Sequence, residues 1–241
     1  MSYTRYNADD LTIELIGEKE VAKALGSIPQ KAPLVIRNAV NETAKDARKV
    51  MIREAKQRYV VNGAGRRHLN DLKVRQKARV SDLGAELHIG GPSQKDAMKN
   101  DLGYFKVIPH KSFVGGNVAN APKHFRAKVL RAGGMHPLDG VRGKLSKGFL
   151  LQFKSGHVGM VQRKIGVESD RKITVKSKVP RWPSKNGIVE QLQTMGSPSA
   201  AAMHHVIWQQ VEPQVQDTLE KKLETSIQKT LARAAKKGTR K

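Results

Sequence analysis

The side chains best suited to chemistry in this sequence are basic. Four of them form a cluster that has His124 and Phe125 between its first two members and no acidic residue nearby: Lys123, Arg126, Lys128 and Arg131. Arg66 and Arg67 form a second basic pair, in a turn that follows a long helical pattern. Flexible basic loops with an occasional aromatic residue can contact nucleic-acid phosphates without reading sequence. A surface that binds an acidic protein subunit would use the same residues, and the sequence leaves both interpretations open.

The overall charge supports a polyanionic neighbour. The 241 residues include 45 Lys and Arg against 21 Asp and Glu, which gives a formal net charge of +24. An excess of this size implies contact with nucleic acid or with an acidic protein surface. Cysteine is absent, which excludes disulfides and thiolate metal sites. The sequence shows neither the apolar run of a signal peptide nor a run of about 18 apolar residues, so we expect no membrane partner.

Motifs of catalysis are missing from the sequence. It contains no G-x-x-x-x-G-K-[ST], no G-x-G-x-x-G and no H-E-x-x-H. His204 and His205 are adjacent, so on a helix they point about 100° apart and cannot hold one ion together. We therefore expect them to be ordinary residues of a helix surface or an interface. The prediction is a protein that is not an enzyme, with no catalytic residues, no metal site and no cofactor.

A long helix is the strongest structural prediction. Between residues 32 and 59 apolar side chains recur every three or four positions, which predicts one amphipathic helix. Its apolar face needs a sheet of this chain or a neighbouring subunit to cover it. A strand at 11–15 and a short helix at 18–25 are predicted before it. After it, alternating apolar residues predict a hairpin of strands 72–80 and 85–89, a second hairpin of 149–153 with 160–163, and a strand at 172–179.

A second long helix is predicted at the C-terminal end. Ser197 fits an N-cap and Pro198 a first helical turn, and apolar residues then recur every fourth position from Met203 to Leu231. Pro213 is expected to kink or divide this helix near Val211. A stripe with this period winds around the helix, which suits packing against more than one partner. The predicted subunit interface comprises Met203, Ile207, Trp208 and Val211, with burial in the chain's own core as the open alternative for Trp208.

The predicted fold class is α+β. An antiparallel sheet is packed by the long helix of the N-terminal half and by the Pro-kinked C-terminal helix, in a single domain over residues 1–241. Residues 90–147 are rich in Gly, Pro and basic residues, and they form a long basic loop insertion or arm, or contain strands that the pattern does not reveal. Residues 236–241 form a basic tail.

Three segments carry a resemblance to a known family. The first runs from 40–44 to 58–61, where the long helix ends in a basic and aromatic turn. The second is the strand–Gly–strand unit at 149–163, and the third is 196–199 followed by Met203 and the C-terminal helix. In this order they resemble the bacteriophage minor tail protein Z-like family, the tail completion proteins. Together they cover about half of the chain, and residues 90–147 depart from the family pattern by being longer and more basic.

The resemblance implies a function without catalysis. Members of this family are virion proteins at the head-proximal end of a long tail, and a similar protein would assemble as a homo-oligomeric ring in the host cytoplasm. Its expected role is tail completion and head-tail joining, and its expected partners are copies of itself, the tail terminator, the tape-measure end and packaged DNA. The main alternative is a non-sequence-specific nucleic-acid-binding protein, and a nuclease with unrecognised motifs ranks third.

Overall fold

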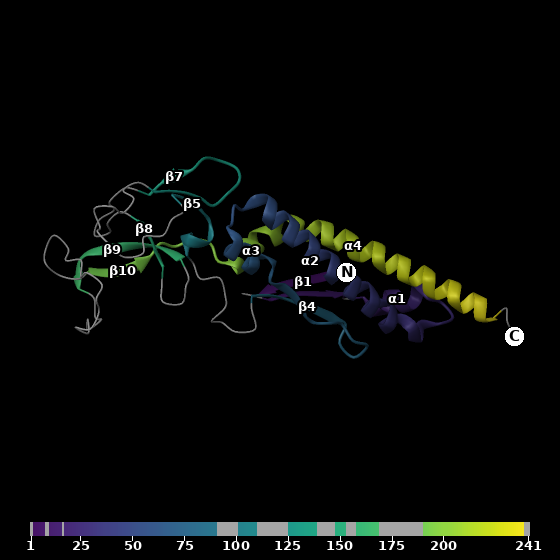
Figure 1. The fold of residues 1–241 in the computed structure, drawn as a ribbon. Helices are drawn as coiled ribbons and strands as arrows, with labels where there is room; N and C mark the ends of the chain where they lie inside the picture. The colour runs from purple at the N-terminus through teal and green to yellow at the C-terminus, as the bar shows by residue number, and fades with distance from the viewer. Residues whose placement is uncertain are drawn as a thin grey trace. The chain divides into compact units, whose positions relative to one another are not determined.

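The computed structural model describes residues 2–7, 10–15, 17–90, 101–109, 125–138, 148–152, 158–168 and 190–238 (Figure 1). It has the predicted α+β composition, with antiparallel sheets and two long helices. The sequence pattern predicts one domain over 1–241, whereas the contacts separate two compact units. Unit 1 comprises Met1–Ala55, His68–Ala97 and Ala200–Lys241, and unit 2 comprises Lys56–Arg67 and Met98–Ser199.

Unit 1 is built on a four-stranded antiparallel sheet. Its strands are β1 (Ser2–Asn7), β2 (Asp10–Leu15), β3 (Leu72–Gln76) and β4 (Gly84–Ile89), in the order β1-β2-β4-β3. In β2 and β4 every second side chain is buried, and Leu11 pairs with Leu87 across the two strands. This alternation confirms the predicted strand at 11–15 and the predicted hairpin. The first hairpin strand is shorter than predicted and ends at Gln76, so Val80 lies 53% exposed in the turn.

Helix α2 (Ala32–Arg58) confirms the long helix of the sequence prediction. Its buried side chains lie along one stripe, and they are mostly small or branched: Ala32, Val35, Ile36, Ala39, Val40, Thr43, Ala44, Ala47, Met51 and Ala55. Helix α1 (Glu18–Ala24), also predicted, and the 3-10 turn η1 (Pro29–Lys31) lead into it. Small residues along a stripe let neighbouring backbones approach closely, so α2 can be covered with few large apolar side chains.

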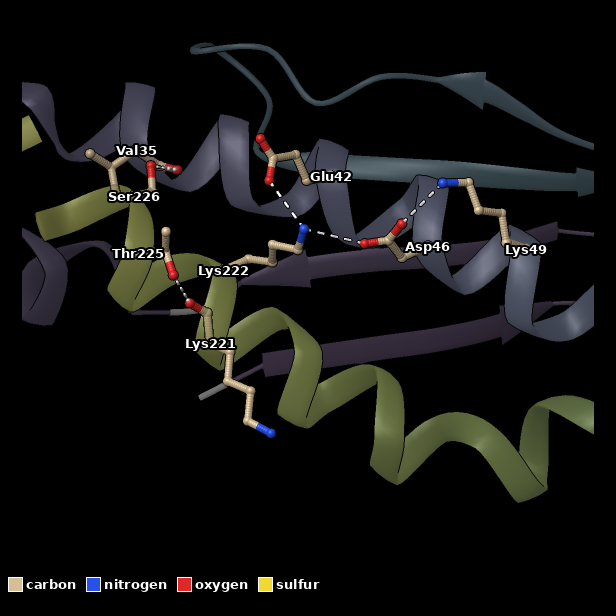
Figure 2. Close-up of polar contacts among 8 residues, drawn as sticks. All are labelled: Val35, Glu42, Asp46, Lys49, Lys221, Lys222, Thr225 and Ser226. Carbon is tan, nitrogen blue, oxygen red and sulfur yellow. Dashed lines mark hydrogen bonds and ion pairs between the residues drawn. The ribbon is translucent and has the colours of Figure 1, made fainter. Parts of the chain in front are cut away.

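Helix α4 (Ala200–Gly238) runs antiparallel to α2 in unit 1 (Figure 2). The Lys222 ammonium lies 3.4 Å from Glu42 Oε2 and 3.3 Å from Asp46 Oδ2 of α2. One turn further along, the Ser226 hydroxyl donates to the carbonyl of Val35 at 3.5 Å. Both carboxylates raise the pKa of Lys222, chiefly through the hydrogen bond to Asp46. The helix continues through Pro213 without being divided.

The beginning of α4 differs from the prediction. The helix begins at Ala200, so neither Ser197 nor Pro198 belongs to its first turn. The Ser197 hydroxyl is buried and has no hydrogen-bond partner among the described residues. Two residues before it, the Met195 N–H still donates to the Met160 carbonyl at 2.8 Å, so the pairing of this segment with β9 continues almost to Ser197.

The predicted subunit interface on α4 requires correction. Met203, Ile207, Trp208 and Val211 are between 0% and 5% exposed, inside the core of unit 1. Their own chain already covers them, because α4 contacts strands β1 and β4 of the sheet. They stabilise the fold and offer little surface to another subunit. Apolar residues that remain exposed lie further along the same helix, where Leu231 is 38% exposed.

The described part of unit 2 contains two small antiparallel sheets. The first has the order β5-β6-β7, with β5 (Lys106–Ile108), β6 (Arg126–Lys128) and β7 (His136–Pro137). The second has the order β10-β9-β8, with β8 (Phe149–Gln152), β9 (Val158–Glu168) and β10 (Glu190–Thr194). The β8–β9 pair confirms the second predicted hairpin, and strands β5 to β7 lie within the segment predicted as an insertion. The predicted strand at 172–179 falls outside the described residues.

Two polar side chains hold the connections of unit 2 together. Asn62 caps α3 (Gly63–Asn70), because its Oδ1 accepts from the Gly65 N–H at 2.9 Å, and its Nδ2 donates to the Gly103 carbonyl at 2.6 Å. Buried Asp101 accepts from the N–H groups of Gly103 and Met160 at 2.7 and 3.1 Å, which joins the 3-10 turn η2 (Leu102–Tyr104) to β9. Burial, together with the charge of Asp101, raises the pKa of Tyr104.

We predict that Asn41→Ala destabilises unit 1. The Asn41 side chain donates to the Ala78 carbonyl at 3.0 Å and accepts from the Ala78 N–H at 2.9 Å, and Ala78 is only 3% exposed. Removing the amide leaves two buried backbone groups unsatisfied, so the free energy of unfolding should fall by about 1–3 kcal/mol. Urea denaturation measures this, with Lys45→Ala on the exposed face of α2 as the control. Equal stabilities of the two variants would contradict the assigned role.

Candidate functional site

The most distinctive surface of unit 2 is a basic face on the β5–β6 pair. Side chains alternate along both strands, so Val107 and Ala127 are buried while the other side chains project outward. The outward residues define what we call the basic face: Lys106, Ile108, Arg126 and Lys128. Three of the four are cationic, and none of the carboxylates in the described residues forms a salt bridge with them in the structure. The face can therefore accept an anion.

Like charges are opposed directly within this face. Lys106 of β5 pairs with Lys128 of β6, and Arg126 lies two residues before Lys128 on the same side of β6. Directly opposed like charges destabilise an antiparallel pair, whereas opposite charges would stabilise it. The arrangement costs stability in the isolated chain, and a bound polyanion would remove that cost. This relation between stability and charge is the physical reason for regarding the face as a binding site.

The predicted basic cluster is only partly brought together. Arg126 and Lys128 lie side by side on the basic face, and Lys106, which the sequence pattern does not single out, joins them. Strands of three residues are too short for periodicity to reveal, so only their pairing identifies Lys106. Arg131 has another task, because its Nε donates to the Lys56 carbonyl at 2.9 Å and its N–H donates to the Arg58 carbonyl at 2.8 Å. It thereby satisfies carbonyls at the end of α2.

The remaining predicted contacts lie elsewhere. Arg66 and Arg67 are on α3 with exposed side chains, in a helix where the sequence predicts a turn. Lys123 lies outside the described residues. The candidate site that the structure supports is therefore the basic face, with Arg66 and Arg67 as further exposed cations of the same unit.

Unit 1 holds an acid–histidine pair on the solvent side of its sheet. His88 Nδ1 lies 2.6 Å from Asp10 Oδ1, across the β2–β4 pairing. In enzymes such a carboxylate orients an imidazole that serves as a general base beside a nucleophile or substrate. Here the neighbour that completes the group is Arg75, at 3.5 Å from Glu86 and 3.8 Å from Asp10. Arg75 of β3 thus faces carboxylates of β4 and β2, and opposite charges on neighbouring strands stabilise the sheet, which is the role that the contacts support.

His204 is the most deeply buried titratable group among the described residues of unit 1, contrary to the expectation of a surface or interface residue. It is 0% exposed, and its Nε2 lies 2.8 Å from the Leu69 carbonyl, which requires the proton on Nε2. Nδ1 has no hydrogen-bond partner among the described residues. Burial lowers the pKa of His204, although the bond to Leu69 acts in the opposite direction. A buried neutral imidazole of this kind makes the fold sensitive to acid.

Comparisons with known proteins identify no relative. No family model matches the sequence, and neither a curated protein nor a solved structure matches it significantly. Within the described ranges, no three His, Cys, Asp or Glu side chains converge as a metal site would require. None of the helices in the same ranges combines the length and hydrophobicity needed to cross a membrane. The candidate site rests on the geometry and charge of the basic face.

We predict that Lys128→Glu stabilises unit 2. The substitution places opposite charges at the Lys106–Lys128 pair, so the free energy of unfolding should rise by about 0.2–1 kcal/mol, and more at low salt than at high salt. Thermal denaturation in low and high salt measures the change. Lys164→Glu, on β9 of the same unit, introduces the same charge change away from this pair and is the control. A loss of stability in Lys128→Glu alone would show that the two lysines do not repel each other.

We predict that His204 makes the protein less stable in mild acid. Its pKa is lowered in the folded state, so the unfolded chain takes up the proton first. Stability is then complete above the unfolded pKa of about 6.5 and falls as the pH drops below it, by at most about 1.4 kcal/mol per pH unit. Unfolding by urea between pH 7.5 and 5 measures this slope. His204→Gln, which can still donate to Leu69, should reduce the slope, whereas His205→Gln on the exposed side should leave it unchanged.

Proposed function

We propose that this protein is a structural virion component of a tailed bacteriophage. In this proposal it is a minor tail or tail completion protein that forms a ring at the head-proximal end of the tail and contributes to tail completion and head-tail joining. The observation that carries the proposal is an uncovered apolar stripe on α4. Its side chains are buried as far as Leu219, whereas Leu223 and Ile227 are half-buried and Leu231 is exposed. A long helix left partly uncovered by its own chain suits a protein that is completed by neighbouring subunits.

The segments that resemble the family correspond to elements that organise both units. The first is α2 with the chain that follows it, the second is the β8–β9 hairpin, and the third leads into α4. The basic face supports the same proposal, because a protein at the head-proximal end of a tail adjoins packaged DNA. Acidic surfaces of the tail terminator or of the tape-measure end are the other partners that we propose for it.

A nonsense mutation in this chain, made in the genome of the phage that encodes it, tests the function. We expect lysates of a non-suppressing host to contain DNA-filled heads and separate tails, because the particle would lack the component that completes the tail. Electron microscopy counts joined and separate particles, and a suppressing host provides the control. Particles joined at the normal frequency without the protein would refute head-tail joining as its function.

One observation favours the alternative function, a non-sequence-specific nucleic-acid-binding protein. The opposed Lys106 and Lys128, with Arg126 beside them, present three cations on one small surface. If each of them contacts a phosphate, replacing one should weaken binding to all sequences. The slope of log K against log salt concentration should also become shallower by about one. Fluorescence anisotropy with unrelated DNA duplexes measures both quantities. Light scattering separates the proposals further, since a discrete multimer in the absence of DNA supports the ring and a monomer that binds DNA supports the alternative.

A further inference from the structure

The C-terminal end of α4 continues as a helix beyond its contacts with α2. Ser226 still contacts Val35, near the beginning of α2 at Ala32, but α4 continues to Gly238 (Figures 1 and 2). At about 1.5 Å per residue the twelve positions after Ser226 add about 18 Å of helix. Figure 1 shows this end of α4 extending past α1 and α2 of the same unit. We call residues 223–238 the α4 end.

Charge and apolar surface coincide at the α4 end. The sequence from Thr225 onward contains six basic residues and no acidic residue, and four of the six lie within the described helix: Lys229, Arg233, Lys236 and Lys237. Leu223, Ile227 and Leu231 continue the apolar stripe over the same turns, with increasing exposure. A partner for this segment should therefore offer a cleft that is both acidic and partly apolar.

Unit 1 contains a cleft with these properties, lined by α1, the end of β2 and the turn before β4. Its volume is about 980 Å³. Four carboxylates line it against a single lysine, Lys19, in a chain whose basic residues outnumber its acidic ones two to one: Glu14, Glu18, Glu20 and Asp82. Apolar residues of the lining include Leu83 and Val80, and Val80 is the most exposed large apolar residue among those described. We call it the α1 cleft.

The α4 end cannot fill the α1 cleft of its own chain. Lys222 and Ser226 hold α4 along α2, and the helix runs without a break to Gly238, so it cannot turn back toward α1. A second copy of the chain offers the same cleft without this restriction. We propose that the α4 end docks into the α1 cleft of a second copy. The inference rests on the proposed function, since it supplies the subunit contact that a ring requires, and it places that contact on opposite charges and exposed apolar side chains.

Exchanging charges between the two surfaces tests the docking. Glu18→Lys/Glu20→Lys should weaken self-association at least tenfold, and Lys229→Glu/Arg233→Glu should do the same. Mixing the two variants should restore association. The basic α4 end of the first variant then meets the acidic cleft of the second, and the acidic α4 end of the second meets the basic cleft of the first. Lys45→Glu/Lys56→Glu, two exposed positions of α2, carries the same charge change as the α4 variant and should associate like the original protein. Analytical ultracentrifugation measures the masses, and circular dichroism confirms that each variant is folded.

Cross-linking gives a second test that leaves the acidic residues of α1 unchanged. The chain has no cysteine, so Val80→Cys and Leu231→Cys each introduce a single thiol. A short bismaleimide should cross-link a mixture of the two variants far more efficiently than either variant alone. A protein that remains monomeric at all concentrations, or charge variants that are not restored by mixing, would overturn the docking. Head-tail joining in the mutant phage is judged separately, so normal joining with successful charge exchange would refute the function and retain the docking.

Discussion

Burial of the apolar stripe of α2 is the constraint on which unit 1 depends. The stripe extends over nearly the whole 27-residue helix, and an isolated helix of this kind would leave it in water. The sheet supplies one covering surface and α4 the other, and polar contacts fix their positions. Arg48 Nε donates to the Leu72 carbonyl of β3, while Lys222 of α4 joins two carboxylates one turn apart on α2. The position of these contacts along α2 therefore determines the residue of α4 after which the helix extends beyond the rest of unit 1.

The predictions that succeeded rest on patterns long enough to repeat. The 27 residues of α2 show several turns of helical period, and β2 and β4 alternate over six residues each, so local sequence determines both. Strand β10 cannot be predicted from a repeating pattern, because Glu190–Thr194 is mostly polar and forms a strand through its pairing with β9. The three-residue strands β5 and β6 are equally hidden. Their pairing, which no local pattern contains, is what brings Lys106 to the candidate site.

The first half of α4 shows why an apolar stripe does not reveal what covers it. Met203 and Ile207 have the same spacing as Ile227 and Leu231, yet the first pair is buried and the second is half-buried or exposed. The difference arises because α2 begins at Ala32, so α2 does not cover the part of α4 beyond the contact between Ser226 and Val35. A stripe of this period fits the chain's own core or another subunit equally well, and only tertiary structure divides it between the two. His204 lies next to Met203 in the part of α4 that the chain itself covers, and it is therefore a core residue.

The distribution of charge gives the two units different electrostatic roles. In unit 1 acidic residues neutralise nearby bases, as Asp10 and Glu86 do for Arg75, or gather in the α1 cleft. In unit 2 the basic face opposes Lys106 to Lys128, so the chain carries repulsion that a simple exchange of sign would remove. A folded chain with a net charge of +24 already bears self-repulsion. Concentrating part of it on a three-stranded sheet is costly for an isolated monomer, and that cost is offset when the neighbour is a polyanion.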